Sequence, residues 1–204
     1  TAITIDGQDV TKLPEHKRAA FLGRVFQDPM MGTAPTMQIE ENLALAARRG
    51  QPRGLKWGIT ALERADYREL LKTLDLGLED RLTAKVGLLS GGQRQALTLL
   101  MASLKQPKLL LLDEHTAALD PKTADKVLAL SDQIVQENNL TTLMITHNMK
   151  DAIAHGNRLI MMDAGRVVVD ISGEDKKKLT VPDLLALFSR ASGSDEANDK
   201  MLLS

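Results

Sequence analysis

The sequence predicts an α/β protein built on a parallel sheet, and three neighbouring segments carry this prediction. Lys108 to Leu112 is apolar after its first residue, as in a strand that is covered on both faces of a parallel sheet. Asp120-Pro121 is a strong helix start, with Asp as N-cap and Pro at the first helical position. A second apolar segment, "TTLMIT" (141–146), follows that helix and completes a β-α-β unit.

The residues before this unit predict a mixture of short strands and helices. We expect a hairpin around the "DG" turn near the start, a helix over 14–20 and a strand "LGRVF" ending at Gln27. The pattern from residue 36 to about 76 is mostly helical, with an exposed interruption, "RRGQPRGLKWG", that carries four basic residues. A further helix begins at "LSGGQ" and is stopped by Gln106 and Pro107.

The residues after the unit predict a β-hairpin turning at Ala164-Gly165 in "RLIMMDAGRVVVD". A charged break, "GEDKKK", a short helix, "VPDLLALF", and a frayed tail should follow.

Composition narrows the classes of function. The 204 residues suit one domain with a subdomain, and 43% hydrophobic residues can build a core. A net charge of -1 gives no overall attraction to nucleic acid, and 2% aromatic residues leave few platforms for stacking bases. There is no cysteine, no apolar run of membrane-spanning length and no signal-peptide pattern at the start. We therefore expect a cytoplasmic protein that binds no nucleic acid.

Polar residues follow three predicted strands: Gln27, the pair Asp113-Glu114, and His147. In an open parallel sheet, ligands bind beyond the carboxyl ends of the strands, so these side chains should line one crevice. A carboxylate there can hold Mg²⁺ and the next can position or deprotonate a water, as phosphoryl transfer requires. Each residue taken alone has a structural explanation, as a helix cap, a solvated turn or an ordinary strand end.

The motif "LSGGQ" is more specific. Ser90 and Gln93 have the spacing of a capping box. Gly91 and Gly92 each weaken the first helical turn by about 1 kcal/mol relative to alanine, so they suggest a close backbone approach to some other group. Because a helix N-terminus attracts anions, a phosphate is the expected occupant.

Together, "VFQDP", "LLSGGQRQ", "LLLLDEHTAALD" and "MITHN" resemble the motifs of the ATP-binding cassette (ABC) ATPases, in the same order. The resemblance implies a P-loop NTPase-like sheet with an inserted α-helical subdomain. It assigns ATP and Mg²⁺ as cofactors, Asp113 and Gln27 to the metal, and Glu114 and His147 to catalysis. It further implies that nucleotide is bound by Gln27, Ser90, Gly91, Gly92, Gln93 and Asp120, with Asp120 in the D-loop.

The resemblance also implies partners and an organisation. In this family the "LSGGQ" motif binds the ATP of a second subunit, so we expect a homodimer. "DEHTAALDPKTA" and "FQDPMMGTAPTMQIEENL" are most similar to bacterial amino-acid importers, and His115 to a tryptophan- or tyrosine-related subgroup. Transmembrane permease subunits and a substrate-binding protein would then be partners, and the chain itself would lie at the inner face of the cell membrane. We expect an ATPase core at 1–27 and 107–172, a helical subdomain at 28–106 and a C-terminal helix and tail at 173–204.

One family motif is absent. None of the 14 glycines is followed by Lys, so the phosphate-binding Walker A loop, G-x-x-x-x-G-K-[ST], does not occur in these residues. We expect this loop and the family's first strand to precede Thr1, and the chain alone to bind ATP weakly or not at all. Two alternatives stay open: a non-catalytic truncated fragment, and a soluble ABC ATPase that acts on DNA or translation. The second usually has a long coiled coil or tandem cassettes, neither of which is present here.

Overall fold

The computed structural model describes residues 2–51 and 58–192. Most of the interruption expected to be exposed, and the tail expected to be frayed, lie outside the described residues. The chain forms two compact units, Thr1–Ile145 and Thr146–Ser204. This division falls after Ile145, and the expected boundary between an ATPase core and a helical subdomain stays a prediction.

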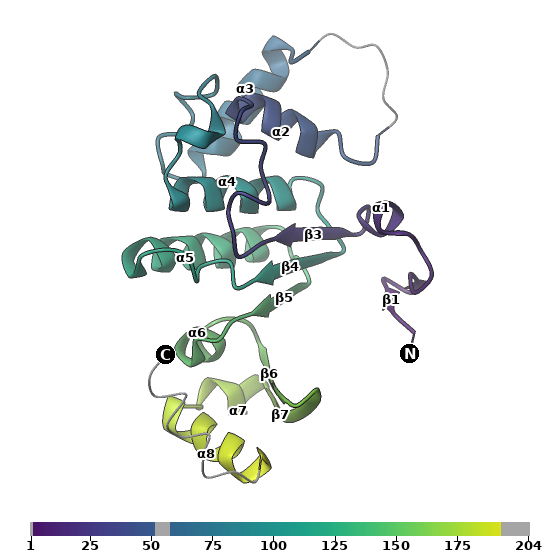
Figure 1. The fold of residues 1–204 in the computed structure, drawn as a ribbon, viewed down its shortest axis with the longest axis vertical. Helices are drawn as coiled ribbons and strands as arrows, with labels where there is room; N and C mark the ends of the chain where they lie inside the picture. Colours follow the sequence, from purple (N-terminus) through teal and green to yellow (C-terminus); the bar gives the residue numbers. More distant parts are fainter. Residues whose placement is uncertain (1, 52–57, 193–204) are drawn as a thin grey trace. The chain divides into compact units, whose positions relative to one another are not determined.

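A three-stranded parallel sheet organises the first unit (Figure 1). Its order is β3 (Leu22–Val25), β4 (Leu109–Asp113), β5 (Thr142–Ile145). Helix α5 (Pro121–Glu137) connects β4 to β5, so the predicted β-α-β unit and the α/β fold class are confirmed. Asp113 is the last residue of β4, one position beyond the predicted end of that strand.

Helices α4 (Gly91–Ser103) and α5 cover one face of this sheet. Leu110 and Leu112 of β4 are buried in the same apolar cluster as Leu97 of α4 and Ile134 of α5. At Gly23 in β3, an added Cβ would lie 2.6 Å from the carbonyl oxygen of Ala102 in α4. The absence of a side chain at Gly23 therefore lets α4 pack directly on the sheet.

The helices of the predicted helical region pack with α4, and α4 lies between α2 and β3 (Figure 1). The Glu40 carboxylate, buried in α2, forms a bidentate ion pair with Arg64 of α3, with N···O distances of 2.5 and 2.8 Å. Because a buried charge needs a partner, this pair ties α2 to α3. The bounds are α2 (Ile39–Ala47), α3 (Ala61–Lys72) and the 3₁₀ turn η1 (Val86–Leu88).

The start of the chain forms the predicted hairpin and short helix. Asp6 and Gly7 both have positive φ, of 51° and 76°, which gives the tight "DG" turn. The bounds are β1 (Thr4–Ile5), β2 (Gln8–Asp9) and α1 (Glu15–Arg18).

The second unit contains the predicted hairpin, which turns at Ala164 and Gly165 with φ of 45° and 77°. The expected charged break is instead a short helix, α7. Lys176 of α7 is buried, and its ammonium is satisfied there because Nζ donates to the carbonyl oxygens of Ile153 and His155 at the end of α6. The bounds are α6 (Met149–Ala154), β6 (Arg158–Asp163), β7 (Arg166–Ser172), α7 (Gly173–Lys177) and α8 (Val181–Ser192).

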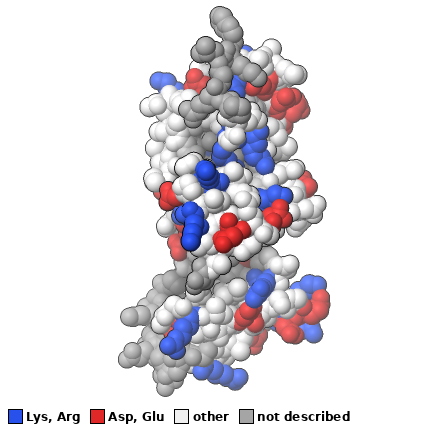
Figure 2. Space-filling model, turned by 90° about the vertical axis from the view of Figure 1, so that its right-hand side faces the viewer, with Lys and Arg blue, Asp and Glu red and all other residues white. Residues whose placement is uncertain are grey.

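Basic and acidic side chains are interspersed on the face of the molecule that Figure 2 shows, in keeping with the net charge of -1. In the described part of the chain, no helix is both long and apolar enough to cross a membrane.

Candidate functional site

The carboxyl ends of β3 and β4 lie side by side, and they bring part of the predicted site together. Val25 is paired with Leu112. Asp113, the last residue of β4, and Gln27, two residues after β3, therefore lie at the same edge of the sheet. Asp113 is in turn paired with Ile145 of β5. Parallel register thus places Gln27, Asp113 and the following Glu114 where open α/β sheets bind ligands.

Glu114 has an unusual backbone conformation at this edge. Its φ is +43°, in the left-handed region that a non-glycine residue rarely adopts, while its amide donates to the carbonyl oxygen of Ile145 at 2.9 Å. Such strain is concentrated at functional sites, where the surrounding structure holds it in place. Five other non-glycine residues of the described chain also have positive φ, so this conformation fixes the turn after β4 without assigning Glu114 a role.

Asp113 has a partner that the sequence did not indicate. Arg24 of β3 donates from Nη2 to Asp113 Oδ2 at 2.9 Å, and its guanidinium lies 4.5 Å from the centre of the Phe26 ring. Arg24 and Asp113 point to the same face of the sheet, because both are one position out of phase with the buried Val25 and Leu112. Strand alternation could have revealed this proximity only once the register was known.

These donors fit Mg²⁺ only together with phosphate. In the described residues, no group of three or more His, Cys, Asp or Glu side chains could hold a metal ion. Mg²⁺ in nucleotide sites commonly takes one or two carboxylates, with waters and phosphate oxygens as its other ligands. Asp113 and the amide oxygen of Gln27 are therefore suitable for a metal that a nucleotide brings, and not for a free-standing metal site.

The start of α4 forms the predicted capping box. Ser90 Oγ accepts from the Gln93 amide at 3.2 Å, and Gln93 Oε1 accepts from the Ser90 amide at 3.1 Å. Gly91 is exposed, and its added Cβ would make an ordinary contact, 3.4 Å from Leu119 Cδ2. The exposed backbone of Gly91 is thus open to a ligand, while the side chains of Ser90 and Gln93 cap the helix.

Gly92 differs from Gly91 because the space beside it is already occupied. It is buried, and an added Cβ would lie 2.1 Å from Thr123 Cγ2. Thr123 lies in the first turn of α5, where its amide donates to the N-cap Asp120 at 3.1 Å. Hydrogen bonds from Thr123 hold the pKa of Asp120 below its usual range. Packing within the chain therefore explains why residue 92 is a glycine. The absence of a side chain there lets the start of α4 contact the start of α5.

His147 belongs to the second compact unit, so its place relative to Asp113 is not defined. It is exposed and follows the last residue of β5 by two positions. Its neighbour Asn148 caps α6 by accepting from the amides of Lys150 and Asp151. The predicted role of His147 stays a prediction.

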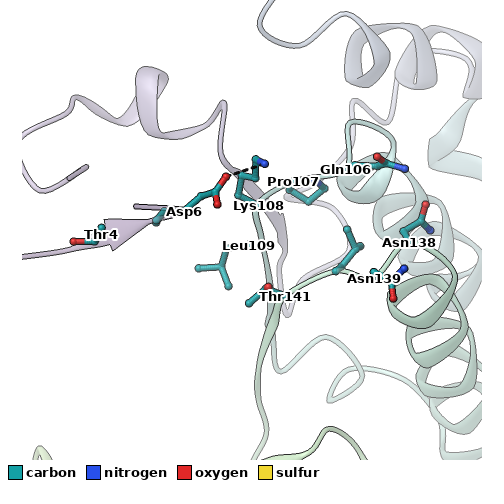
Figure 3. Close-up of a pocket in the computed structure, with 11 residues that line it drawn as sticks. Thr4, Asp6, Gln106, Pro107, Lys108, Leu109, Asn138, Asn139 and Thr141 are labelled. Carbon is teal, nitrogen blue, oxygen red and sulfur yellow. Dashed lines mark ion pairs between the residues drawn. The ribbon is translucent and has the colours of Figure 1, made fainter. Parts of the chain in front are cut away.

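A hollow of about 480 Å³ lies at the opposite end of the sheet (Figure 3). It is lined by residues that precede β4 and β5, such as Lys108 and Thr141, and the ion pair of Lys108 with Asp6 lies beside it. Since ligands in open parallel sheets bind at the carboxyl ends of strands, we do not assign the nucleotide to this hollow.

Comparison with known proteins agrees with the class of fold that the sheet and its edge define. The ATP-binding cassette MJ0796, in a dimeric post-hydrolysis state bound to ADP and Pi, superposes with a TM-score of 0.66 at 29% identity, covering 82% of this chain and 71% of that one. The cassette MJ1267, in an ADP conformation, has a TM-score of 0.67 and 22% identity over 90% of this chain and 74% of that one, which supports the fold alone. The molecule thus has the fold of an ATP-binding cassette.

The sequence comparisons identify the family. The ABC transporter family model matches residues 1–117, and this chain belongs to that family. It is 49% identical to a tyrosine transport ATP-binding protein of Clostridioides difficile over 93% of this chain and 75% of that protein. It is 38% identical to the methionine import ATP-binding protein MetN of Rhizobium etli over 81% of this chain, which spans 44% of that relative.

Proposed function

We propose that this chain is part of the ATP-binding subunit of an amino-acid importer and that it contributes to Mg²⁺-dependent ATP hydrolysis. One observation carries the proposal. In a protein with the cassette fold, Gln27, Asp113 and Glu114 lie at the carboxyl ends of two neighbouring parallel strands, at one edge of the sheet. The tyrosine and methionine transport proteins among its relatives support an amino acid as the transported solute.

The residues at this edge have complementary roles in the proposed reaction. Asp113 would hold Mg²⁺, directly or through water, and Gln27 would contribute its amide oxygen. The metal would supply charge neutralisation at the phosphates. The Glu114 carboxylate accepts a proton from the water that attacks the terminal phosphate. The guanidinium of Arg24 contacts Asp113 Oδ2. For Asp113 to bind the metal, Arg24 would have to move away or remain bound to the carboxylate together with the metal.

The second half of the nucleotide site comes from another copy. At the start of α4 the backbone of Gly91 is exposed, and the positive end of the helix favours phosphate. We propose that Ser90, Gly91, Gly92 and Gln93 contact the nucleotide of the partner subunit, with Asp120 at the same dimer contact. His147 would contact the terminal phosphate.

The phosphate-binding Walker A loop, in this proposal, comes from a segment outside the 204 residues. One face of the sheet supports this. Leu143 and Ile145 are 50% and 51% exposed, and Leu109 and Leu111 on the same face are only half-buried. Parallel sheets are normally covered on both faces, so a further segment would complete this one. We expect the 204-residue chain alone to bind ATP weakly; micromolar affinity with Mg²⁺-dependent turnover would contradict this.

The decisive experiment uses the protein expressed from its complete gene. Glu114→Gln should retain bound ATP without cleaving it and should accumulate a nucleotide-bound dimer, which size-exclusion chromatography detects. Glu69→Gln is the matched control, because Glu69 is an exposed carboxylate on α3 that pairs with Lys72. Fast turnover by Glu114→Gln would remove Glu114 from the role of base, and absence of turnover in the parent protein would refute the proposed ATPase.

Partners and location follow from the same proposal. A dimer of this subunit would bind permease subunits at the inner face of the membrane, and a substrate-binding protein would deliver the amino acid. Co-purification of the tagged subunit with permease subunits tests this, and a stable association with DNA or ribosomes instead would favour the soluble alternative.

A further inference from the structure

A buried glutamine of α4 contacts the residue that precedes Gln27. Gln95 is 0% exposed, and its Nε2 donates to the carbonyl oxygen of Phe26 at 3.0 Å. The orientation of the side-chain amide is fixed, because a carbonyl oxygen only accepts hydrogen bonds. Residues 69 positions apart in sequence are thus joined at the peptide that leads into Gln27.

The carboxamide of Gln95 is only half satisfied. Gln95 Oε1 is buried and has no hydrogen-bond partner in the described chain. An unsatisfied buried acceptor is unfavourable, and it offsets part of the gain from the bond to Phe26. An apolar side chain of similar size would remove this acceptor but would leave the Phe26 carbonyl oxygen without its donor, so what the carboxamide provides is the bond to the Phe26–Gln27 peptide.

The segment after Gln27 also follows α4 closely. An added Cβ at Gly32 would lie 2.3 Å from Thr98 Cγ2, and Arg94 Nη1 lies 2.7 Å from Met30 Sδ. Contacts from neighbouring turns of α4 therefore set the path of residues 26–32. Gln95 makes the first of these contacts, directly beside Gln27.

We propose that Gln95 is a positioning residue for Gln27. It fixes the Phe26–Gln27 peptide to the helix that begins at Ser90, five residues before Gln95. The inference rests on the proposed function, in which Gln27 contacts the nucleotide at its own edge and Ser90 the nucleotide of the partner subunit. Gln95 then joins the two nucleotide contacts of one chain, so that a shift of α4 moves Gln27.

The structural part of this inference is tested on the 204-residue chain without nucleotide. In Gln95→Leu and Gln95→Met, the NMR order parameter of the Gln27 amide should fall from about 0.85 to below about 0.6. The denaturation midpoint should fall only modestly, because removal of the orphan acceptor Oε1 partly offsets the lost hydrogen bond and the Phe26 carbonyl oxygen left without a donor. Ser103→Ala is the control, since the buried Ser103 hydroxyl donates to the carbonyl oxygen of Leu100 within α4 and removing it leaves Phe26 untouched.

Two outcomes overturn the structural part. One is an unchanged order parameter of Gln27 in a folded Gln95 variant. The other is loss of the fold in both variants, which would make the amide a stability determinant.

The functional part is tested in the protein from the complete gene. Gln95→Leu should lower kcat for ATP by on the order of tenfold, as expected when a contact group is misplaced, while KM for ATP stays within about twofold. Parent-like kcat in Gln95→Leu would overturn the inference and leave the proposed function intact. An inactive parent would refute the proposed function. The NMR measurement would still test whether Gln95 holds the Phe26–Gln27 peptide in place.

Discussion

Gly92→Ala tests whether the second glycine of "LSGGQ" is required for packing inside the chain. The new Cβ would lie 2.1 Å from Thr123 Cγ2, well inside van der Waals contact, at a buried position between α4 and α5. Overpacking of this kind costs about 1–3 kcal/mol, and the better helix propensity of alanine returns at most about 1 kcal/mol. We expect the free energy of unfolding to fall by about 1–2 kcal/mol.

Urea denaturation of the 204-residue chain, followed by circular dichroism, measures this change as a lower midpoint at constant slope. Gly91→Ala is the matched control, because its Cβ would lie 3.4 Å from Leu119 Cδ2. It should leave stability unchanged or raise it by up to about 1 kcal/mol.

The double variant Gly92→Ala/Thr123→Ser identifies the clashing atom, since serine lacks the Cγ2 methyl group. The loss caused by Gly92→Ala should largely disappear in the Thr123→Ser background. Equal losses in both backgrounds would refute the packing explanation.

Three further predictions concern stability. Ser131→Ala should cost about 1–3 kcal/mol, because buried His115 loses the hydroxyl 2.9 Å from its Nε2. Ala164→Gly should not destabilise the chain and should raise its stability by up to about 1 kcal/mol, because glycine tolerates a φ of +45° at this exposed turn position. The Thr60 amide and Arg48 lower the pKa of Glu63 to about 2, so Glu63→Gln should destabilise at neutral pH, and its effect should fade as pH drops from about 4.5 to 2.

Each of these three predictions has a result that would contradict it. Stability of Ser131→Ala equal to that of the parent would mean that His115 does not depend on the hydroxyl. A loss of more than about 1 kcal/mol in Ala164→Gly would mean that the left-handed backbone at this position is not strained. For Glu63, the sign follows from the lowered pKa: the folded state favours the carboxylate, so its contribution is complete above the unfolded pKa and is lost below the folded one. A pH-independent effect of Glu63→Gln between pH 2 and 7 would contradict this.

Local sequence signals predicted most elements because they act over a few residues. Asp120 and Pro121 begin α5 where a cap and a first-turn proline place it. Ser90 and Gln93 form the capping box that their spacing indicated. The α7 helix was missed, since its Lys176 is held by carbonyl groups of α6 that no local pattern reveals.

Part of the candidate site could also be predicted from local signals. Polar residues at strand ends identified Gln27 and Asp113 as neighbours, because parallel strands end at a common edge. Their immediate partners could not be predicted. The contacts of Arg24 with Asp113 and of Gln95 with Phe26 join residues 89 and 69 positions apart, and they depend on register and on the path of α4.

The sequence by itself determined the α/β class, the caps, the turns and the residue types available for phosphate chemistry, since these depend on backbone preferences and on periodic burial. Only the tertiary structure decided that Gly92 accommodates Thr123, that Glu114 is held left-handed beside Ile145, and that Gln95 meets the peptide before Gln27. Close packing brings distant segments within contact distance, and a chain read one residue after another does not specify which atoms will meet.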